Sequence, residues 1–322
     1  MVGAGAIGGV IGARLASAGY AVSAVARNET LASLRTHGWS STSPDGERHA
    51  APVATATDDP ADLGPQDVVI IAVKAHHLPA LAPTLAPLLT PDTVLIPALN
   101  GVPWWFFHDF GGALAGTGLD AVDPGGVVSK ALPPEQVIGC VVYFAARTLR
   151  PGHAENTGGD DVVIGEPSRA ASARTAAAAG MLRRGGFTVT VSESIQRDVW
   201  FKLWGNMTIN PISALTGATA DRILNDALVD AFVRRVMTEA AEIGTRIGCP
   251  ITQTLDERIA ATRRLGAFRT SMLQDVDAGR AIELDALVTA VAEIGALTGT
   301  PTPHLDTLLG LTRLAARVRG LY

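Results

Sequence analysis

Two groups of residues in this sequence of 322 residues have the types and the spacing to do chemistry. The first is a glycine loop near the start, Gly3-Ala4-Gly5-Ala6-Ile7-Gly8, with the spacing G-x-G-x-x-G. Between a strand and a helix, this spacing makes a tight turn, lets phosphates approach bare backbone and offers them free N–H groups at the helix start. The loop predicts a dinucleotide-binding site formed by Gly3, Gly5, Ala6, Ile7 and Gly8.

The motif alone is weak evidence for a dinucleotide site, but the residues that follow it support this interpretation. Residues 10–18 form an amphipathic stretch that stops at Gly19, a residue type that commonly ends helices. Residues 20–25 then read as a second strand. Only Met1 and Val2 precede the loop, whereas a buried strand has about five residues. We therefore expect the natural start of the protein to lie several residues upstream of Met1.

The second group consists of Lys202, Asn206 and Asn210, spaced four residues apart within the apolar stretch 200–211. On a helix, this spacing places an ammonium and two amides on one face. Asparagine is a poor helix former, so two of them in an apolar helix require polar partners. Donors of this kind can stabilise negative charge that develops on a substrate oxygen.

A further polar cluster occupies residues 270–275, and Glu283 follows eight residues after Asp275. In one interpretation, Ser271 and Glu283 belong to a substrate site. In the other, Ser271 caps a helix while Asp275 and Glu283 face solvent. The residues alone leave both interpretations open.

The position after the second expected strand indicates which nucleotide the loop would bind. Sites for NAD place an Asp or Glu there, about 20 residues after the loop, to bind the ribose 2′-hydroxyl. Residues 24–28 contain no carboxylate, and Arg27 stands in its place. A guanidinium at this position suits the 2′-phosphate of NADPH through its charge and its fork of donors. The alternative is a surface arginine that follows a strand.

Two further polar residues follow apolar runs that are typical of strands buried on both faces. Lys74 follows residues 67–73, and Asn100-Gly101 follows residues 93–99. In parallel sheets, ligands bind at the carboxyl ends of the strands, so both sites predict contacts with a cofactor. The alternatives are a solvated lysine and a simple Asn-Gly turn.

The first part of the chain alternates short apolar runs with alanine-rich helical stretches, which predicts a mostly parallel, doubly wound sheet. Further strands are expected over residues 137–147, 161–164 and 187–191. The first two of these are expected to pair antiparallel through the turn-rich residues 151–159. Residues 77–89 contain three prolines, so we expect short helical turns there rather than one helix.

The second part of the chain carries helical patterns over residues 224–247 and 282–298, each closed by a glycine and a proline. We therefore predict two domains. Residues 1–191 form an α/β Rossmann-type domain that binds NADP, and residues 192–322 form an all-α domain that carries substrate and catalytic residues.

Composition excludes several classes of protein. The net charge of −5 and the absence of a basic stripe argue against a nucleic-acid partner. Cys140 and Cys249 lie far apart without ligand spacing, so we expect neither a disulfide nor a metal site. The apolar start lacks the positive segment of a signal peptide, and no run of 18 apolar residues predicts a membrane span. We expect a cytoplasmic protein.

Over nearly its whole length, the chain resembles the ketopantoate reductase (2-dehydropantoate 2-reductase) family. The resemblance rests on the starting GAGAIGG, on VK at Lys74, on LNG at Asn100 and on GEP at Gly165. The stretches WFKLWGNMTINP and TSMLQDVDAGRAIELDAL are much more specific than the glycine loop. The resemblance implies a Rossmann-type domain followed by a helical domain. It also implies reduction of 2-dehydropantoate to (R)-pantoate with NADPH, on the way to pantothenate and coenzyme A.

The resemblance also implies roles for individual residues. Lys202 corresponds to the catalytic lysine and Glu283 to the active-site glutamate. Asn206, Asn210, Ser271 and Asn100 correspond to substrate-binding positions, with Ser271 near the carboxylate. Lys74, Asn100 and Arg27 correspond to positions on the cofactor side, Arg27 at the 2′-phosphate.

One departure from the family pattern concerns specificity. Residues 102–108 are unusually aromatic, which indicates either packing or a hydrophobic wall that changes the side chain accepted on the 2-oxo acid. The alternatives to ketopantoate reduction are a related NADPH-dependent reductase of another 2-oxo acid and a non-catalytic NADP(H) sensor. The expected partner is a small-molecule substrate, and the expected state is a monomer or homodimer.

Overall fold

The computed structural model describes residues 1–322, which divide into two compact units. The first unit comprises Met1–Leu99, Trp104–Phe110 and Gly125–Asp198, and the second comprises Asn100–Pro103, Gly111–Pro124 and Val199–Tyr322. Two short segments of the first half of the chain thus group with the second unit. A domain boundary between residues 191 and 192 stays a prediction.

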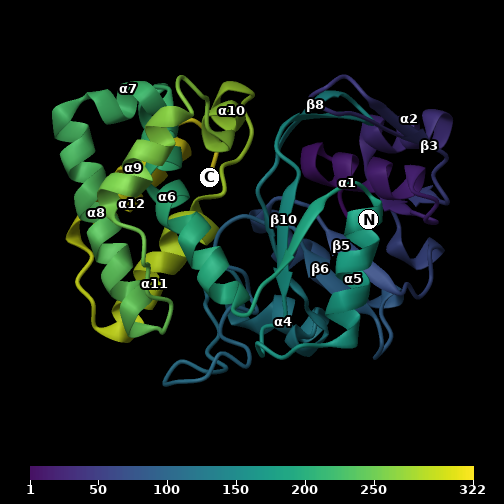
Figure 1. The fold of residues 1–322 in the computed structure, drawn as a ribbon, viewed down its shortest axis with the longest axis horizontal. Coiled ribbons are helices and arrows are strands. Elements are labelled where there is room, and N and C mark those ends of the chain that lie inside the picture. The colour runs from purple at the N-terminus through teal and green to yellow at the C-terminus, as the bar shows by residue number, and fades with distance from the viewer. The chain divides into compact units, whose positions relative to one another are not determined.

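A mostly parallel sheet forms the centre of the first unit (Figure 1). Val2 takes the central strand position, with one parallel bridge to β1 (Ala24–Val25) and one to β5 (Val68–Ile71). β4 (Ala56–Thr57) pairs parallel with β1, and β6 (Val94–Pro97) pairs parallel with β5. The strand expected over residues 20–25 is confined to its last two residues, Ala24 and Val25.

The sheet continues beyond β6 through a parallel bridge between Leu95 and Val137. β7 (Gly139–Val142) pairs antiparallel with β10 (Asp161–Gly165), which pairs parallel with β11 (Thr188–Val191). The predictions of a mostly parallel sheet and of an antiparallel pairing at this edge are confirmed.

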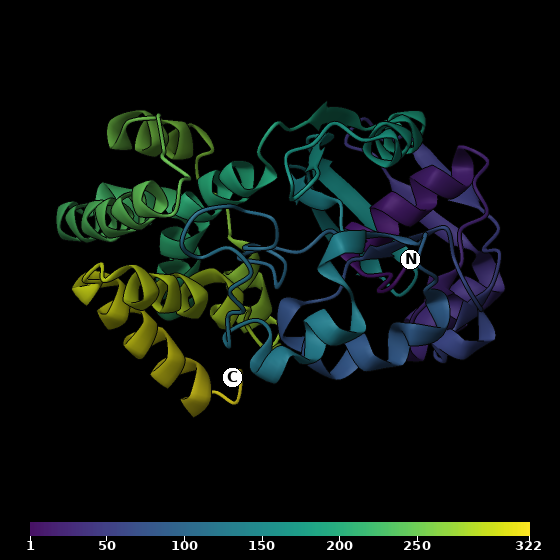
Figure 2. The ribbon, with the colours of Figure 1, turned by 90° about the horizontal axis from the view of Figure 1, so that it is seen from below.

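Helices cover both faces of this sheet. The α-helices of the first unit are α1 (Ala6–Ser17), α2 (Asn28–His37), α3 (Leu78–Leu81), α4 (Val127–Ala131) and α5 (Ala173–Arg184). Short 3₁₀ turns cover Pro60–Asp62, Ala75–His77, Ala82–Leu88, Pro124–Gly126 and Pro134–Gln136. Figure 2 shows α5 on one side of the strands and the turns of residues 75–88 on the other. These turns are as short as expected, because the prolines remove backbone donors that a continuous helix needs.

A second sheet of four strands packs against α1, and nothing in the sequence analysis predicted it. Its order is β3 (Arg48–Ala51), β2 (Trp39–Thr42), β9 (His153–Gly158) and β8 (Ala145–Arg150). The expectation of one strand over residues 137–147 is wrong, because β7 and β8 belong to different sheets. The expectation that the turn-rich residues 151–159 connect the two paired strands is also wrong, because most of that segment is β9 of the second sheet. These strands consist mainly of small, polar and charged residues, so they lack the apolar runs of doubly buried strands.

The second unit is helical, as predicted. It contains most of α6 (Ile195–Thr216), together with α7 (Ala220–Asn225), α8 (Ala227–Arg246), α9 (Leu255–Arg264), α10 (Ser271–Asp277), α11 (Ala290–Thr298) and α12 (Pro303–Val318). A π-helical turn, Asp285–Thr289, leads into α11. The helix expected over residues 224–247 begins only at Ala227, because the Asp226 side chain accepts the N–H groups of Leu228 and Val229 as a cap.

The aromatic stretch after Asn100 is part of a core. Trp104, Trp105, Phe106 and Phe107 are each at most 6% exposed. The indole of Trp104 donates to the Leu132 carbonyl at 3.1 Å, and the rings of Phe106 and Phe107 lie edge to face. Packing, and not exposure to a ligand, accounts for these residues.

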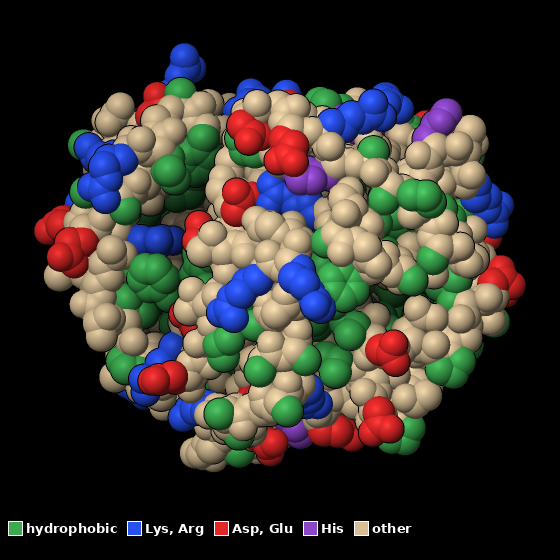
Figure 3. Space-filling model, turned by 45° about the vertical axis from the view of Figure 1, so that its right-hand side comes forward, with side chains coloured by type: hydrophobic (Ala, Val, Ile, Leu, Met, Phe, Trp, Pro, Cys, Tyr) green, Lys and Arg blue, Asp and Glu red, His purple; other side chains and the backbone are tan.

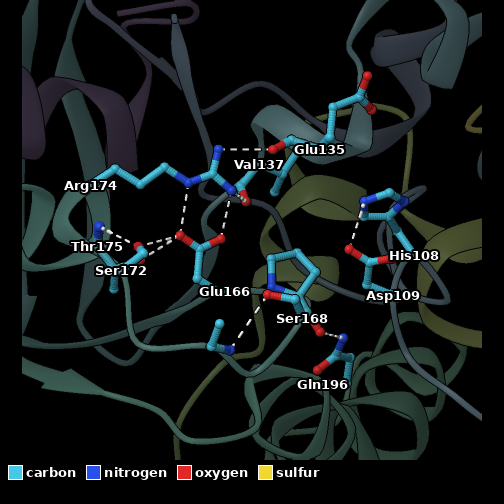
Figure 4. Close-up of polar contacts among 12 residues, drawn as sticks. His108, Asp109, Glu135, Val137, Glu166, Ser168, Ser172, Arg174, Thr175 and Gln196 are labelled. Atoms are coloured by element: carbon cyan, nitrogen blue, oxygen red, sulfur yellow. Dashed lines mark hydrogen bonds and ion pairs between the residues drawn. The ribbon is translucent and has the colours of Figure 1, made fainter.

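An ion pair between buried Glu166 and half-buried Arg174 holds the edge of the main sheet to α5 (Figure 4). Glu166, next to the end of β10, is 4% exposed and accepts two hydrogen bonds from Arg174, at 2.8 and 2.6 Å. The hydroxyls of Ser172 and Thr175 donate to the same carboxylate. Burial alone would raise the pKa of Glu166, but the hydrogen bonds from Arg174, Ser172 and Thr175 outweigh it and lower that pKa.

We expect Glu166→Gln to lower the free energy of unfolding by about 1–2 kcal/mol, because a neutral amide leaves the Arg174 charge without its counterion and water screens that half-buried charge only in part. Urea denaturation near neutral pH measures this loss. Glu135→Gln is the matched control, since Arg174 binds the backbone carbonyl of Glu135 and not its exposed carboxylate.

The pH dependence of the same pair gives a second readout. The pKa of Glu166 is lowered from 4.5 on folding, so its stabilisation is present above that value and is lost as the pH falls through the folded-state pKa. The stability gap between wild type and Glu166→Gln should therefore narrow in acid. A gap that stays constant down to strongly acidic pH would contradict this account.

Candidate active site

The glycine loop emerges at the carboxyl edge of the main sheet. The Val2 N–H donates to Ile70, its carbonyl accepts from Ala72, and Gly3 donates to Val25, all at 2.8–3.0 Å. Val2 thus fixes the loop between β1 and β5 although it is a single residue. Ligands of parallel sheets bind at this edge, so the loop lies where a dinucleotide site is expected.

The start of α1 is shaped to receive an anion. A Cβ at Gly8 would lie 2.0 Å from the Gly3 carbonyl oxygen, so only glycine lets the helix approach its loop this closely. A Cβ at Gly5 would meet nothing within 4 Å, so the space in front of the helix is open. No side chain caps α1, and its first turn contains no acidic residue. Unmatched N–H groups and the positive end of the helix dipole therefore fit a pyrophosphate.

Two predicted cofactor residues lie at strand ends of the same unit. Arg27 is exposed and immediately precedes α2, two residues after β1. Lys74 is half-buried and precedes the 3₁₀ turn Ala75–His77, three residues after β5. Their contacts with a cofactor stay predictions.

In the second unit, the structure joins two predicted site residues directly. The Lys202 ammonium donates to Oδ1 of Asn100 at 2.8 Å, although 102 residues separate them in sequence. Lys202, Asn206 and Asn210 all lie on α6, and their spacing places them along one face of that helix. The substrate contacts of Asn206 and Asn210 stay predictions.

Two tryptophans set the rotation of α6 about its axis. The indole N–H of Trp200 donates to Ala240 at 3.2 Å, and that of Trp204 donates to Met237 at 2.7 Å. Both acceptors are backbone carbonyls of α8, and both indoles are at most 2% exposed. Because these bonds anchor one side of α6, they hold the direction in which Lys202 leaves the helix.

Asn100 is positioned by a contact that the sequence analysis missed. The N–H of Val102 donates to the Ala286 carbonyl at 2.8 Å, within the π-helical turn. Gly101 has a φ of +86°, and a Cβ there would lie 2.4 Å from the Ala286 oxygen. The Asn-Gly pair had been open to interpretation as a simple turn, but Gly101 is required for close approach to the π-helical turn. Turns of this kind occur frequently at functional sites.

The structure does not support the interpretation in which Ser271 caps a helix and Asp275 and Glu283 face solvent. Thr270, and not Ser271, caps α10, since its hydroxyl accepts the Leu273 N–H. Asp275 and Glu283 are 3% and 8% exposed, so neither is solvated. Ser271 is exposed in the first turn of α10, and Glu283 lies two residues before the π-helical turn. The roles of Ser271 and Glu283 toward a substrate stay predictions.

No helix is both long and apolar enough to cross a membrane, and no three His, Cys, Asp or Glu side chains are grouped as metal ligands. Both cysteines are buried, and neither forms a disulfide. On the face drawn in Figure 3, acidic and basic side chains are interspersed.

Family models match both parts of the chain. The model described as "Ketopantoate reductase PanE/ApbA" matches residues 1–104, and "Ketopantoate reductase PanE/ApbA C terminal" matches residues 194–316. The first match contains the glycine loop, Arg27, Lys74 and Asn100. The second contains Lys202 and Glu283.

Similar proteins agree with this assignment. The 2-dehydropantoate 2-reductase of Mesorhizobium japonicum is 43% identical over 99% of this chain and 98% of its own. The crystal structure of a candidate ketopantoate reductase from Ralstonia solanacearum MolK2 is 54% identical, with a TM-score of 0.95 over 100% of this chain and 98% of its own. D-mandelate dehydrogenase, solved with NADH and anilino(oxo)acetate, shares the fold at 20% identity and a TM-score of 0.81, with complete coverage of both chains. Together with the family models, these relatives show that the chain belongs to the ketopantoate reductase family of oxidoreductases.

Proposed function

We propose that this protein reduces the ketone of 2-dehydropantoate to (R)-pantoate with NADPH, a step in the synthesis of pantothenate and coenzyme A. The observation that carries the proposal is the hydrogen bond from Lys202 to Asn100, which holds an ammonium in place on α6. The relative from Mesorhizobium japonicum, named for this reaction, supports the choice of substrate.

Lys202 acts as the general acid in this proposal. A nicotinamide cofactor bound at the glycine loop supplies the hydride for the ketone carbon. Negative charge then develops on the ketone oxygen, where the Lys202 ammonium stabilises it and donates a proton. Asn100 accepts one of the three N–H groups of the ammonium, and this hydrogen bond holds the ammonium in place.

The other polar residues of the second unit orient the substrate. Amide donors from Asn206 and Asn210 bind the 2-oxo acid, and the Ser271 hydroxyl binds near its carboxylate. Glu283, which is 8% exposed, binds the product hydroxyl or positions the Lys202 ammonium. Each of these roles follows from the family pattern and from the residue's chemistry.

The preference for NADPH rests on Arg27. Residues 24–28, from β1 to the first residue of α2, contain this guanidinium and no carboxylate. A positive charge without a competing carboxylate suits a 2′-phosphate. Lys74, at the end of β5, adds a second cation on the cofactor side.

Steady-state oxidation of NADPH tests the proposed reaction, with 2-dehydropantoate compared against a panel of branched and aromatic 2-oxo acids. We expect the highest kcat/KM for 2-dehydropantoate. A clearly higher value for another 2-oxo acid would support the alternative specificity instead. Rates equal to the substrate-free control throughout would favour the non-catalytic NADP(H) sensor.

We expect Lys202→Ala to lower kcat by about two orders of magnitude or more, because the ketone oxygen loses its proton donor. Steady-state kinetics measure this loss, and Lys130→Ala is the matched control because Lys130, on α4, donates to the carbonyl of Gly125 in the turn that precedes the helix. A kcat near that of the wild type would remove Lys202 from the mechanism.

For Arg27→Ala, we expect the KM for NADPH to rise about tenfold or more while the KM for NADH changes little, since only NADPH carries the 2′-phosphate. The two cofactors are compared in the same variant, so NADH is an internal control. An unchanged KM for NADPH would contradict the proposed role.

The substitution Gly101→Ala should lower kcat about tenfold or more, because a Cβ so close to the Ala286 oxygen displaces Asn100 from Lys202. Gly217→Ala is a matched control, since Gly217 also has a positive φ but open space around its Cβ position. If both variants lose the same fraction of kcat at equal thermal stability, the π-helical turn has no positioning role.

A further inference from the structure

A small cavity lies in the first unit, away from the glycine loop. It has a volume of about 230 Å³ and is formed by the end of α2, the four-stranded sheet and the β8–β9 turn. Figure 1 shows α2, β3 and β8 at the upper right. Its lining residues are Ser33, His37, Ser40, Arg48, Arg150 and Gly152. No carboxylate is among them.

Strand register brings the two arginines onto the same face of this sheet. Arg48 lies opposite Thr42 across the β2–β3 pair, and Arg150 lies opposite His153 across the β8–β9 pair. Neither guanidinium forms an ion pair. The nearby Glu155 is bound at 2.5 Å by Arg147, which lies further along β8 and does not line the cavity. The cavity therefore concentrates positive charge that the protein itself does not neutralise.

The pKa of His153, which is bonded to Ser40 of the cavity wall, indicates the sign of the electrostatic potential there. Its ring is held between the hydroxyls of Ser40 and Thr42, at 2.8 and 3.2 Å. The pKa of His153 is lowered from 6.5, first by burial and then by Arg150 and Arg48, and the opposing effect of Glu155 does not cancel them. The field at the ring is thus net positive.

The wall of the cavity is built by a close contact between the β8–β9 turn and α2. Gly152 has a φ of +74°, and a Cβ there would lie 2.3 Å from the Ser33 hydroxyl oxygen. Glycine therefore lets the turn close onto the helix. The contact places Arg150, one residue before the turn, at the edge of the cavity beside Ser33.

We propose that this cavity binds a phosphate group, as inorganic phosphate or as the phosphate of a small phosphomonoester. Two guanidiniums match phosphate oxygens in charge and geometry, and the hydroxyls of Ser33 and Ser40 supply neutral partners. The volume lies below the 300 Å³ at which pockets for drug-sized ligands begin, which favours a small anion over a larger ligand. The site is distinct from the cofactor loop, since the ten residues of α2, about 15 Å of helix, separate Arg27 from His37.

Isothermal titration calorimetry tests the proposal with the full chain saturated with NADP⁺, so that phosphate cannot occupy the glycine loop. Inorganic phosphate is titrated at constant ionic strength set with sodium chloride. We expect saturable binding of one phosphate per chain. In Arg48→Gln and in Arg150→Gln, we expect the affinity to fall about tenfold or more, as for the loss of one charged hydrogen bond.

Arg184→Gln is the matched control, because it removes the same charge from an exposed position on α5, outside the cavity. Unchanged affinity in this variant would support the site. Equal affinity in the wild type and in both cavity variants would overturn the proposal, as would the absence of saturable heat in the wild type. Titration of glycerol 3-phosphate separates the two sources: tighter binding than inorganic phosphate indicates a phosphomonoester, and equal or weaker binding indicates free phosphate.

Discussion

The close approach of α1 to the loop before it is the constraint on which the first unit depends. Gly8 packs against the Gly3 carbonyl with no room for a side chain, while Val2 bonds to strands on both sides. Buried Arg14 then ties the same helix to Asp160 at 2.6 Å and to Ser43 at 2.8 Å. Because α1 also packs on the second sheet, both sheets fix the position of its N–H groups. The end of α1 that we propose to bind the cofactor's pyrophosphate is therefore preorganised by the whole unit rather than by the loop alone.

The second unit positions its lysine through backbone contacts of the same kind. The π-helical turn presents the Ala286 carbonyl to Val102, and Gly101 allows the close approach that this requires. Asn100 is thereby held where it accepts from Lys202, while two indole hydrogen bonds fix the rotation of α6. An ammonium fixed in this way need not reorganise when charge develops on a substrate oxygen, which is the main advantage of a preorganised donor.

Patterns that depend on local spacing were readable in the sequence. The glycine loop, the apolar strands β5 and β6, and the helical second half all appear as expected, because burial on both faces and a 3.6-residue period leave clear signals. The four-stranded sheet left no such signal, since its strands are short and half-polar. The pairing of Lys202 with Asn100 was not predicted, because a contact across 102 residues has no local signature. The contact between Gly101 and the π-helical turn was missed for the same reason, although the sequence analysis had singled out the Asn-Gly pair itself.

Transfer of an isotopic label tests the central claim most directly, namely that this chain reduces a ketone with hydride from a nicotinamide. The protein is incubated with 2-dehydropantoate and NADPH that carries deuterium at both positions of nicotinamide C4, and the product is analysed by mass spectrometry. The account predicts pantoate with a single deuterium on the carbon that carries the new hydroxyl. Unlabelled pantoate, or no pantoate above the level of a protein-free control, would contradict it.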